Sequence, residues 1–141
     1  MSVNVALLGV NGDEGICPPE AEYSPCVCRD YYGDGTLLLD CDYRYLDDQQ
    51  ISDMLNFFLL EQGISPLSVL RLENNKLTKI PTQIKSFPRL KEVYLWQNAI
   101  ETIEANSLHF IGLEKLVGMG GKVKVIEPGA FTGITFGITL K

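Results

Sequence analysis

Basic residues are scarce in this chain of 141 residues, where 12 Lys and Arg stand against 18 Asp and Glu for a net charge of −6. Nucleic acids and anionic membranes attract proteins through a basic surface, so this balance argues against both as partners. No apolar stretch reaches the roughly 20 residues that cross a bilayer. There is one histidine, His109, and no Gly-x-Ser-x-Gly or Walker-type phosphate motif. We therefore expect neither an enzyme nor a bound cofactor.

Cysteine is missing from the chain after residue 41, and the first third holds all four: Cys17, Cys26, Cys28 and Cys41. An even set gathered at one end is typical of a disulfide framework, and hence of an oxidising compartment. Residues 1–10, MSVNVALLGV, contain no Lys or Arg, so they make a poor secretory signal. Two interpretations stay open. The cysteine clustering favours a secreted, extracellular protein whose signal is missing or degenerate; the other is a cytosolic protein whose cysteines have another role.

The cysteine spacing C-x8-C-x-C-x12-C allows three disulfide connectivities and does not choose among them. A zinc site is one alternative, but zinc ligands pair at spacings such as C-x2-4-C, and His109 is far away in sequence. A redox-active pair lacks its C-x-x-C motif. We therefore favour a structural role for the cysteines and expect no metal site.

One pattern of leucines occurs twice. Residues 67–77, LSVLRLENNKL, and residues 90–100, LKEVYLWQNAI, share the template L-x-x-[LV]-x-L-x-x-N-x-[LI] at a spacing of 23 residues. Residues 113–123, LEKLVGMGGKV, form a degenerate third copy, in which Gly118 replaces a leucine and Gly121 replaces the asparagine. A period in the twenties is the signature of a solenoid.

Alternation within each copy predicts a short strand. In the first copy Leu70 and Leu72 are expected to face the core, and Val69, Arg71 and Glu73 to face outward. Each strand is expected to pair in parallel with the next, about 4.8 Å away. One copy cannot bury its apolar face alone, so stacking is needed for stability.

Each strict copy carries an asparagine just after its strand, at Asn75 and Asn98. The side-chain amide of such a residue can bond backbone groups that a turn leaves unpaired. We therefore expect stacked asparagines that form a ladder.

Residues 46–63, LDDQQISDMLNFFLLEQG, predict an amphipathic helix between the cysteines and the repeats. Its apolar residues recur at steps of three and four: Ile51, Met54, Leu55, Phe58 and Leu59. Asp47 and Asp48 suit its N-terminus and Gly63 its C-terminus. The helix lacks a basic face, which favours packing against the first repeat over a membrane or partner helix. Residues 36–41, TLLLDC, are expected to form the edge strand that starts the sheet.

Together these motifs resemble the extracellular leucine-rich-repeat family, most closely over residues 67–126. The resemblance implies an α/β fold: a leucine-rich-repeat solenoid with short parallel strands on its concave face. The cysteine segment resembles the N-terminal cap of that family, which implies a disulfide-stapled cap. The cysteine pairs that the family pattern implies are Cys17–Cys28 and Cys26–Cys41.

The order of cysteines, L-x-L-D-C motif, helix and repeats is also similar to secreted arthropod leucine-rich-repeat proteins. These include relatives of the non-catalytic subunit of shrimp luciferin monooxygenase, which carry more repeats than this chain. The likeness implies a non-enzymatic secreted protein that binds another protein. An accessory subunit that stabilises a secreted enzyme is the alternative.

The expected organisation has three parts. Residues 1–16 are a leader or disordered segment, residues 17–63 the cysteine-rich cap with the amphipathic helix, and residues 64–141 about three repeats with the last one incomplete. An uncapped C-terminal edge would expose core residues, so we expect it to favour self-association.

Outward strand residues line the concave face of a solenoid, which is its usual binding surface. The predicted partner contacts are Arg71, Glu73, Glu92, Tyr94, Trp96 and Met119. Tyr94 and Trp96 stand two apart, so both are expected to face away from the core as candidate binding hot spots. The alternative is that they are partly covered, or are surface aromatics without a role.

Overall fold

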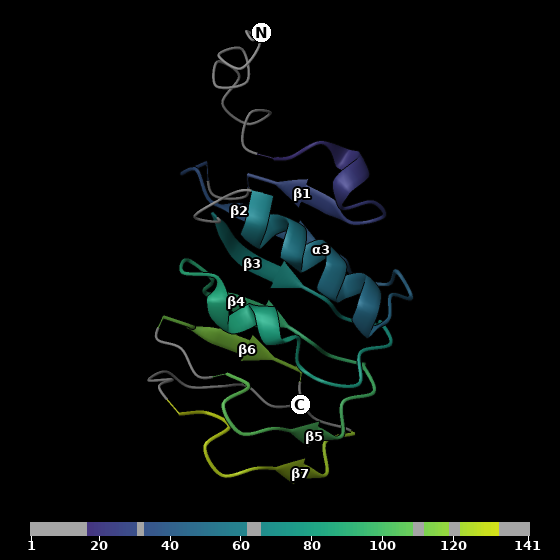
Figure 1. The fold of residues 1–141 in the computed structure, drawn as a ribbon, viewed down its shortest axis with the longest axis vertical. Coiled ribbons are helices and arrows are strands. Elements are labelled where there is room, and N and C mark those ends of the chain that lie inside the picture. Colours follow the sequence, from purple (N-terminus) through teal and green to yellow (C-terminus); the bar gives the residue numbers. More distant parts are fainter. Residues whose placement is uncertain (1–16, 31–32, 62–65, 109–111, 119–121, 133–141) are drawn as a thin grey trace, which may run out of the picture.

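The computed structural model describes residues 17–30, 33–61, 66–108, 112–118 and 122–132 (Figure 1). The predicted leader at 1–16 and the C-terminal edge at 133–141 lie outside these residues. The elements are η1 (Glu20–Glu22), β1 (Val27–Arg29), β2 (Leu37–Asp40), α3 (Asp48–Glu61), β3 (Leu67–Arg71), η2 (Thr82–Ser86), β4 (Glu92–Tyr94), β5 (Thr102–Ile103), β6 (Lys115–Val117) and β7 (Val125–Ile126).

A five-stranded sheet in the order β1-β2-β3-β4-β6 forms one side of the molecule, and β5 and β7 form a second, two-stranded sheet. From β2 to β6 every pair of neighbours is parallel. Arg71 pairs with Tyr94 and Tyr94 with Val117, so each strand repeats the register of the one before. The parallel pairing predicted between successive copies is confirmed, and the chain is a mixed α/β protein.

The prediction that residues 36–41 form the edge strand is wrong. Strand β1 pairs antiparallel on the outer side of β2, with Val27 opposite Asp40 and Arg29 opposite Leu38. Nothing in the three residues Val-Cys-Arg signals a strand, because a segment this short shows no alternation. The neighbouring disulfides hold this segment against β2, so covalent links supply what local sequence does not.

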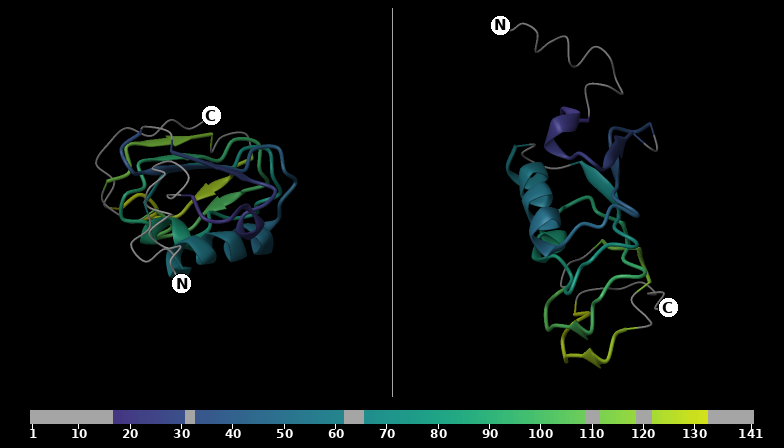
Figure 2. Two further views of the ribbon diagram at one scale, coloured as in Figure 1. Left: turned by 90° about the horizontal axis from the view of Figure 1, so that it is seen from above. Right: turned by 90° about the vertical axis from the view of Figure 1, so that its right-hand side faces the viewer.

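Helix α3 forms where the apolar periodicity predicts it, and it lies on the side away from strands β2 and β3 (Figure 2). Its stripe is buried at Ile51, Leu55 and Phe58. The N-terminus is closed by a reciprocal pair: the N–H of Gln50 donates to Oδ1 of Asp47, and the N–H of Asp47 donates to Oε1 of Gln50, both at 2.9 Å. This is a capping box, which satisfies two N–H groups that the helix leaves unpaired.

The two predicted asparagines are buried and bind backbone groups of two successive copies. The N–H of Leu77 donates to Oδ1 of Asn98 at 2.9 Å. Nδ2 of Asn98 donates to the carbonyls of Leu72 at 2.8 Å and Leu95 at 3.0 Å. Asn98 therefore joins its own copy to the preceding one through backbone bonds. The expected contact of one asparagine with the next is replaced by backbone between them.

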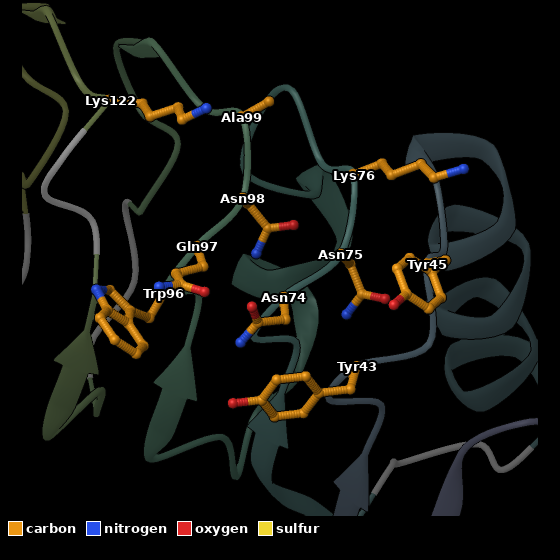
Figure 3. Close-up of a pocket in the computed structure, with 10 residues that line it drawn as sticks. All are labelled: Tyr43, Tyr45, Asn74, Asn75, Lys76, Trp96, Gln97, Asn98, Ala99 and Lys122. Atoms are coloured by element: carbon orange, nitrogen blue, oxygen red, sulfur yellow. The ribbon is translucent and has the colours of Figure 1, made fainter.

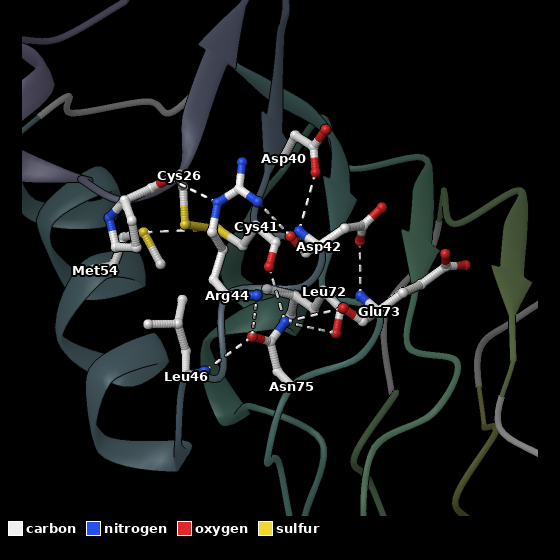
Figure 4. The surroundings of a disulfide bond; sticks show 11 residues. Cys26, Asp40, Cys41, Asp42, Arg44, Leu46, Met54, Leu72, Glu73 and Asn75 are labelled. Atoms are coloured by element: carbon white, nitrogen blue, oxygen red, sulfur yellow. Dashed lines mark hydrogen bonds between the residues drawn. A yellow bond between two sulfur atoms is a disulfide. The ribbon is translucent and has the colours of Figure 1, made fainter.

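Asn75 makes the same bonds one step earlier, against the cap (Figure 4). Its Oδ1 accepts the N–H of Leu46 at 2.9 Å and that of Arg44 at 3.3 Å. Its Nδ2 donates to the carbonyls of Cys41 at 2.8 Å, Leu72 at 3.1 Å and Glu73 at 3.2 Å. The cap thus offers the first repeat the bonds that a repeat would offer.

The cap holds two disulfides, Cys17–Cys28 and Cys26–Cys41, which are the pairs that the family resemblance implies. Cys26 and Cys41 are buried within the core. Sδ of Met54, on helix α3, lies 3.8 Å from Sγ of Cys41. The second disulfide therefore ties the N-terminal segment to the sheet at the place where the helix packs on it.

Gly118 occupies a place that no other residue fits. Its φ is +88°, and a Cβ there would lie 2.4 Å from Cβ of Trp96. The glycine that replaces the repeat leucine is therefore explained by the close approach of the Trp96 backbone.

Candidate binding surfaces

The outward face of the sheet carries a stack of charged and aromatic groups over β3, β4 and β6, which we call the sheet cluster: Arg71, Tyr94 and Lys115. The guanidinium carbon of Arg71 lies 4.4 Å from the ring centroid of Tyr94. Nζ of Lys115, on the strand at the other side, lies 5.4 Å from the same centroid. Both distances allow cation–π attraction, so the parallel register gathers two cations on one ring.

Acidic side chains fix this cluster in place. Nε of Arg71 donates to Oδ2 of Asp42 at 2.9 Å, and its Nη2 lies 3.3 Å from Oε1 of Glu73. Oδ1 of Asp42 accepts the backbone N–H of Glu73 at 2.8 Å. Tyr94 donates its hydroxyl to Oε1 of Glu92 at 2.8 Å. Arg71 and Tyr94 are thus held in one arrangement before anything binds.

Partial burial shifts two titrations in this cluster. Burial raises the pKa of Tyr94, and the hydrogen bond to Glu92 raises it further, so the hydroxyl stays a donor at neutral pH. Burial also raises the pKa of the Glu73 carboxyl; the charge of Asp42 adds to the rise, and Arg71 opposes it. The folded protein therefore holds the Glu73 proton to a higher pH than the unfolded chain does.

This shift predicts a pH dependence of stability. Between the ordinary carboxyl pKa and the raised pKa of Glu73, the folded state binds more protons than the unfolded state, so the free energy of unfolding falls as pH rises. We expect Glu73→Gln to remove this fall, and the exposed Glu101→Gln to leave it in place. Urea denaturation from about pH 4 to pH 7 measures both slopes. Equal slopes for the two variants would contradict the assignment.

The structure gathers four of the six predicted contact residues on the sheet face: Arg71, Glu73, Glu92 and Tyr94. Trp96 follows the end of β4, is 44% exposed, and lies at the margin of a groove. Met119 lies outside the described residues. Val69 is 3% exposed, so its predicted outward position is not an accessible one. It pairs with Leu38 on the next strand, and these apolar neighbours shield each other.

A groove with a volume of about 700 Å³ opens where the chain turns after the strands, and we call it the turn groove (Figure 3). Two columns of residues line it, each at the 23-residue step of the repeats. The first column is Tyr43, Asn74 and Gln97, and the second is Tyr45, Lys76, Ala99 and Lys122. Trp96 stands at one end (Figure 3). Because Ala99 is small, the second column has a gap between its two lysines.

Backbone geometry turns these residues outward. Tyr43, Tyr45, Asn74 and Gln97 have φ between 57° and 59°, a left-handed conformation that is uncommon outside glycine. The N–H of Asn74 donates to the carbonyl of Trp96, as the N–H of Tyr43 donates to that of Glu73, both at 2.9 Å. The cap tyrosine therefore repeats the turn of the first copy. Because this equivalence depends on how the cap joins the sheet, the sequence alone did not indicate the groove.

Comparison of the chain with family models, curated proteins and solved structures gave no match. Within the described ranges no three His, Cys, Asp or Glu side chains form a group that could hold a metal. No helix in those ranges is long and apolar enough to cross a membrane. The sheet cluster and the turn groove carry cations, aromatic rings and amides, so the chemistry that they offer is recognition.

Proposed function

We propose that this chain is a non-enzymatic, extracellular leucine-rich-repeat protein that binds a protein partner through the outward face of its sheet. Parallel strands at a constant step, buried asparagines after two of them, and a cap with two disulfides all support the repeat interpretation. The disulfides also support an oxidising compartment.

The sheet cluster is the observation that carries the binding proposal. Tyr and Arg are enriched among residues that dominate binding energy, and Trp96 adds a third such side chain nearby. The ion pairs of Arg71 with Asp42 and Glu73 reduce the entropy lost when a partner fixes this side chain. Charges of both signs lie around Tyr94, which suits a partner with its own mixture of acidic and basic groups.

The test begins with the protein secreted from eukaryotic cells behind a supplied signal, used as bait in extracellular fluid of its source. For a captured protein, Tyr94→Ala is expected to weaken binding by about 30-fold, the effect of losing a hot spot worth about 2 kcal/mol. The matched control is Lys85→Ala, on η2 away from the sheet. Unchanged affinity of every captured protein for both Tyr94→Ala and Trp96→Ala would refute the proposal. Capture of an enzyme whose activity depends on this chain would indicate an accessory subunit.

A further inference from the structure

The turn groove differs in charge from the rest of the chain. Its lining residues include Lys76 and Lys122 and no Asp or Glu, in a protein with net charge −6. Figure 3 shows the two lysines on either side of Ala99. Both are exposed, and neither takes part in the ion pairs found in the described part of the chain. A basic edge on an acidic protein attracts an anionic ligand.

The same groove gathers exposed aromatic rings. Tyr43 is 62% exposed, Tyr45 75% and Trp96 44%. Each ring offers a flat apolar face together with a polar hydroxyl or N–H group. The amides of Asn74 and Gln97 lie in the adjoining column and supply donors and acceptors. Flat apolar faces beside amides match a sugar ring, which has C–H faces and a rim of hydroxyl groups.

A peptide fits this groove less well. An extended peptide adds to a free strand edge, whereas the groove is made of turns whose N–H groups at Tyr43 and Asn74 already donate to the adjoining strand segments. Ala99 is the one aliphatic side chain among the lining residues, so the groove lacks pockets for apolar peptide side chains. Its volume of about 700 Å³ is that of a small-ligand site.

We propose that the turn groove binds a short acidic oligosaccharide, one that carries carboxylate or sulfate groups. The aromatic rings stack on its sugar rings, the amides bond its hydroxyls, and Lys76 and Lys122 pair with its anionic groups. This site is separate from the sheet cluster, and it stands whether or not the sheet face binds a protein.

Trp96 makes the test direct because it is the single tryptophan of the chain. The probe is a sulfated, uronic-acid-containing oligosaccharide, titrated while the tryptophan fluorescence is followed. We expect a saturable change that added salt weakens. Lys76→Gln and Lys122→Gln are each expected to lower the affinity about tenfold, the effect of one charged hydrogen bond. Tyr45→Asn, which keeps a residue tolerant of positive φ, is expected to lower it as well.

The matched control is Lys79→Gln, an exposed lysine that lies beside α3 and η2 instead of the groove, and it is expected to bind like the parent chain. Thermal unfolding of each variant shows that its fold is retained. Equal binding of an uncharged oligosaccharide of the same length would overturn the anionic specificity. Equal binding of an acidic peptide would overturn the assignment to a sugar. Absence of saturable binding in both fluorescence and calorimetry would overturn the whole proposal.

Discussion

Removal of the Cys26–Cys41 disulfide by the paired substitution Cys26→Ala and Cys41→Ala is expected to lower the free energy of unfolding by about 4 kcal/mol. The two cysteines are 15 residues apart, and closing such a loop contributes about 3 kcal/mol in the chain-entropy interpretation. Both are buried in the core, and Met54 contacts Cys41, so loss of packing adds to the effect. Urea denaturation measures the change.

The Cys17–Cys28 disulfide provides the matched control for this experiment. Its separation is 11 residues, so the loop contribution is similar, but both cysteines are only partly buried. Cys17→Ala with Cys28→Ala is therefore expected to cost less, and the difference measures the packing at Cys26 and Cys41. A denatured, unreduced parent chain is expected to show no free thiol. Unfolding midpoints that do not change without Cys26–Cys41 would contradict the structural role given to this disulfide.

Asn75→Ala is expected to lower the free energy of unfolding by about 3 kcal/mol or more. The substitution leaves the N–H groups of Arg44 and Leu46 without their acceptor, and the carbonyl of Cys41 without a side-chain donor. Each buried polar group that loses its partner costs about 1–3 kcal/mol. Because these groups join the cap to the first repeat, the loss separates two parts of one core. Urea denaturation again gives the magnitude.

Asn75→Asp and Asn98→Ala sharpen this result. Aspartate keeps an acceptor for the N–H of Leu46 but places a charge beside the carbonyls of Cys41 and Leu72, so Asn75→Asp is expected to be destabilising too. Asn98 holds one N–H where Asn75 holds two, and Asn98→Ala is expected to cost somewhat less. An Asn75→Ala protein that unfolds at the parent urea concentration would show that these bonds contribute little.

Much of the framework could be read from the sequence because it rests on periodicity. The two strict copies fix where strands form and which side of each faces the core, as Leu70 and Leu72 show by being fully buried. The spacing of Ile51, Leu55 and Phe58 fixes the helix and its buried stripe in the same way. Of the contact residues on the sheet face, Arg71 and Tyr94 meet because the register between copies is constant.

Other features arise from contacts between parts of the chain that no local pattern connects. Strand β1 exists through its pairing with β2 and the nearby disulfides, and its three residues carry no signal of their own. The burial of Val69 depends on Leu38 beside it. Gly118 looks like a lost leucine in the sequence, but the Trp96 backbone occupies the space that a side chain needs. The turn groove needs Tyr43 and Tyr45 in register with the repeats, which only the joined sheet provides.

The equivalence of Asn75 and Asn98 has a bearing on how such a chain is assembled from parts. Asn75 bonds Leu46 and Cys41 as Asn98 bonds Leu77 and Leu72, so each joint between neighbouring units has the same shape and the same donors and acceptors. A unit of 23 residues with this pattern fits between any two existing ones without a new kind of joint. The number of units is therefore free to vary by duplication or deletion, with the cap serving as a universal connector.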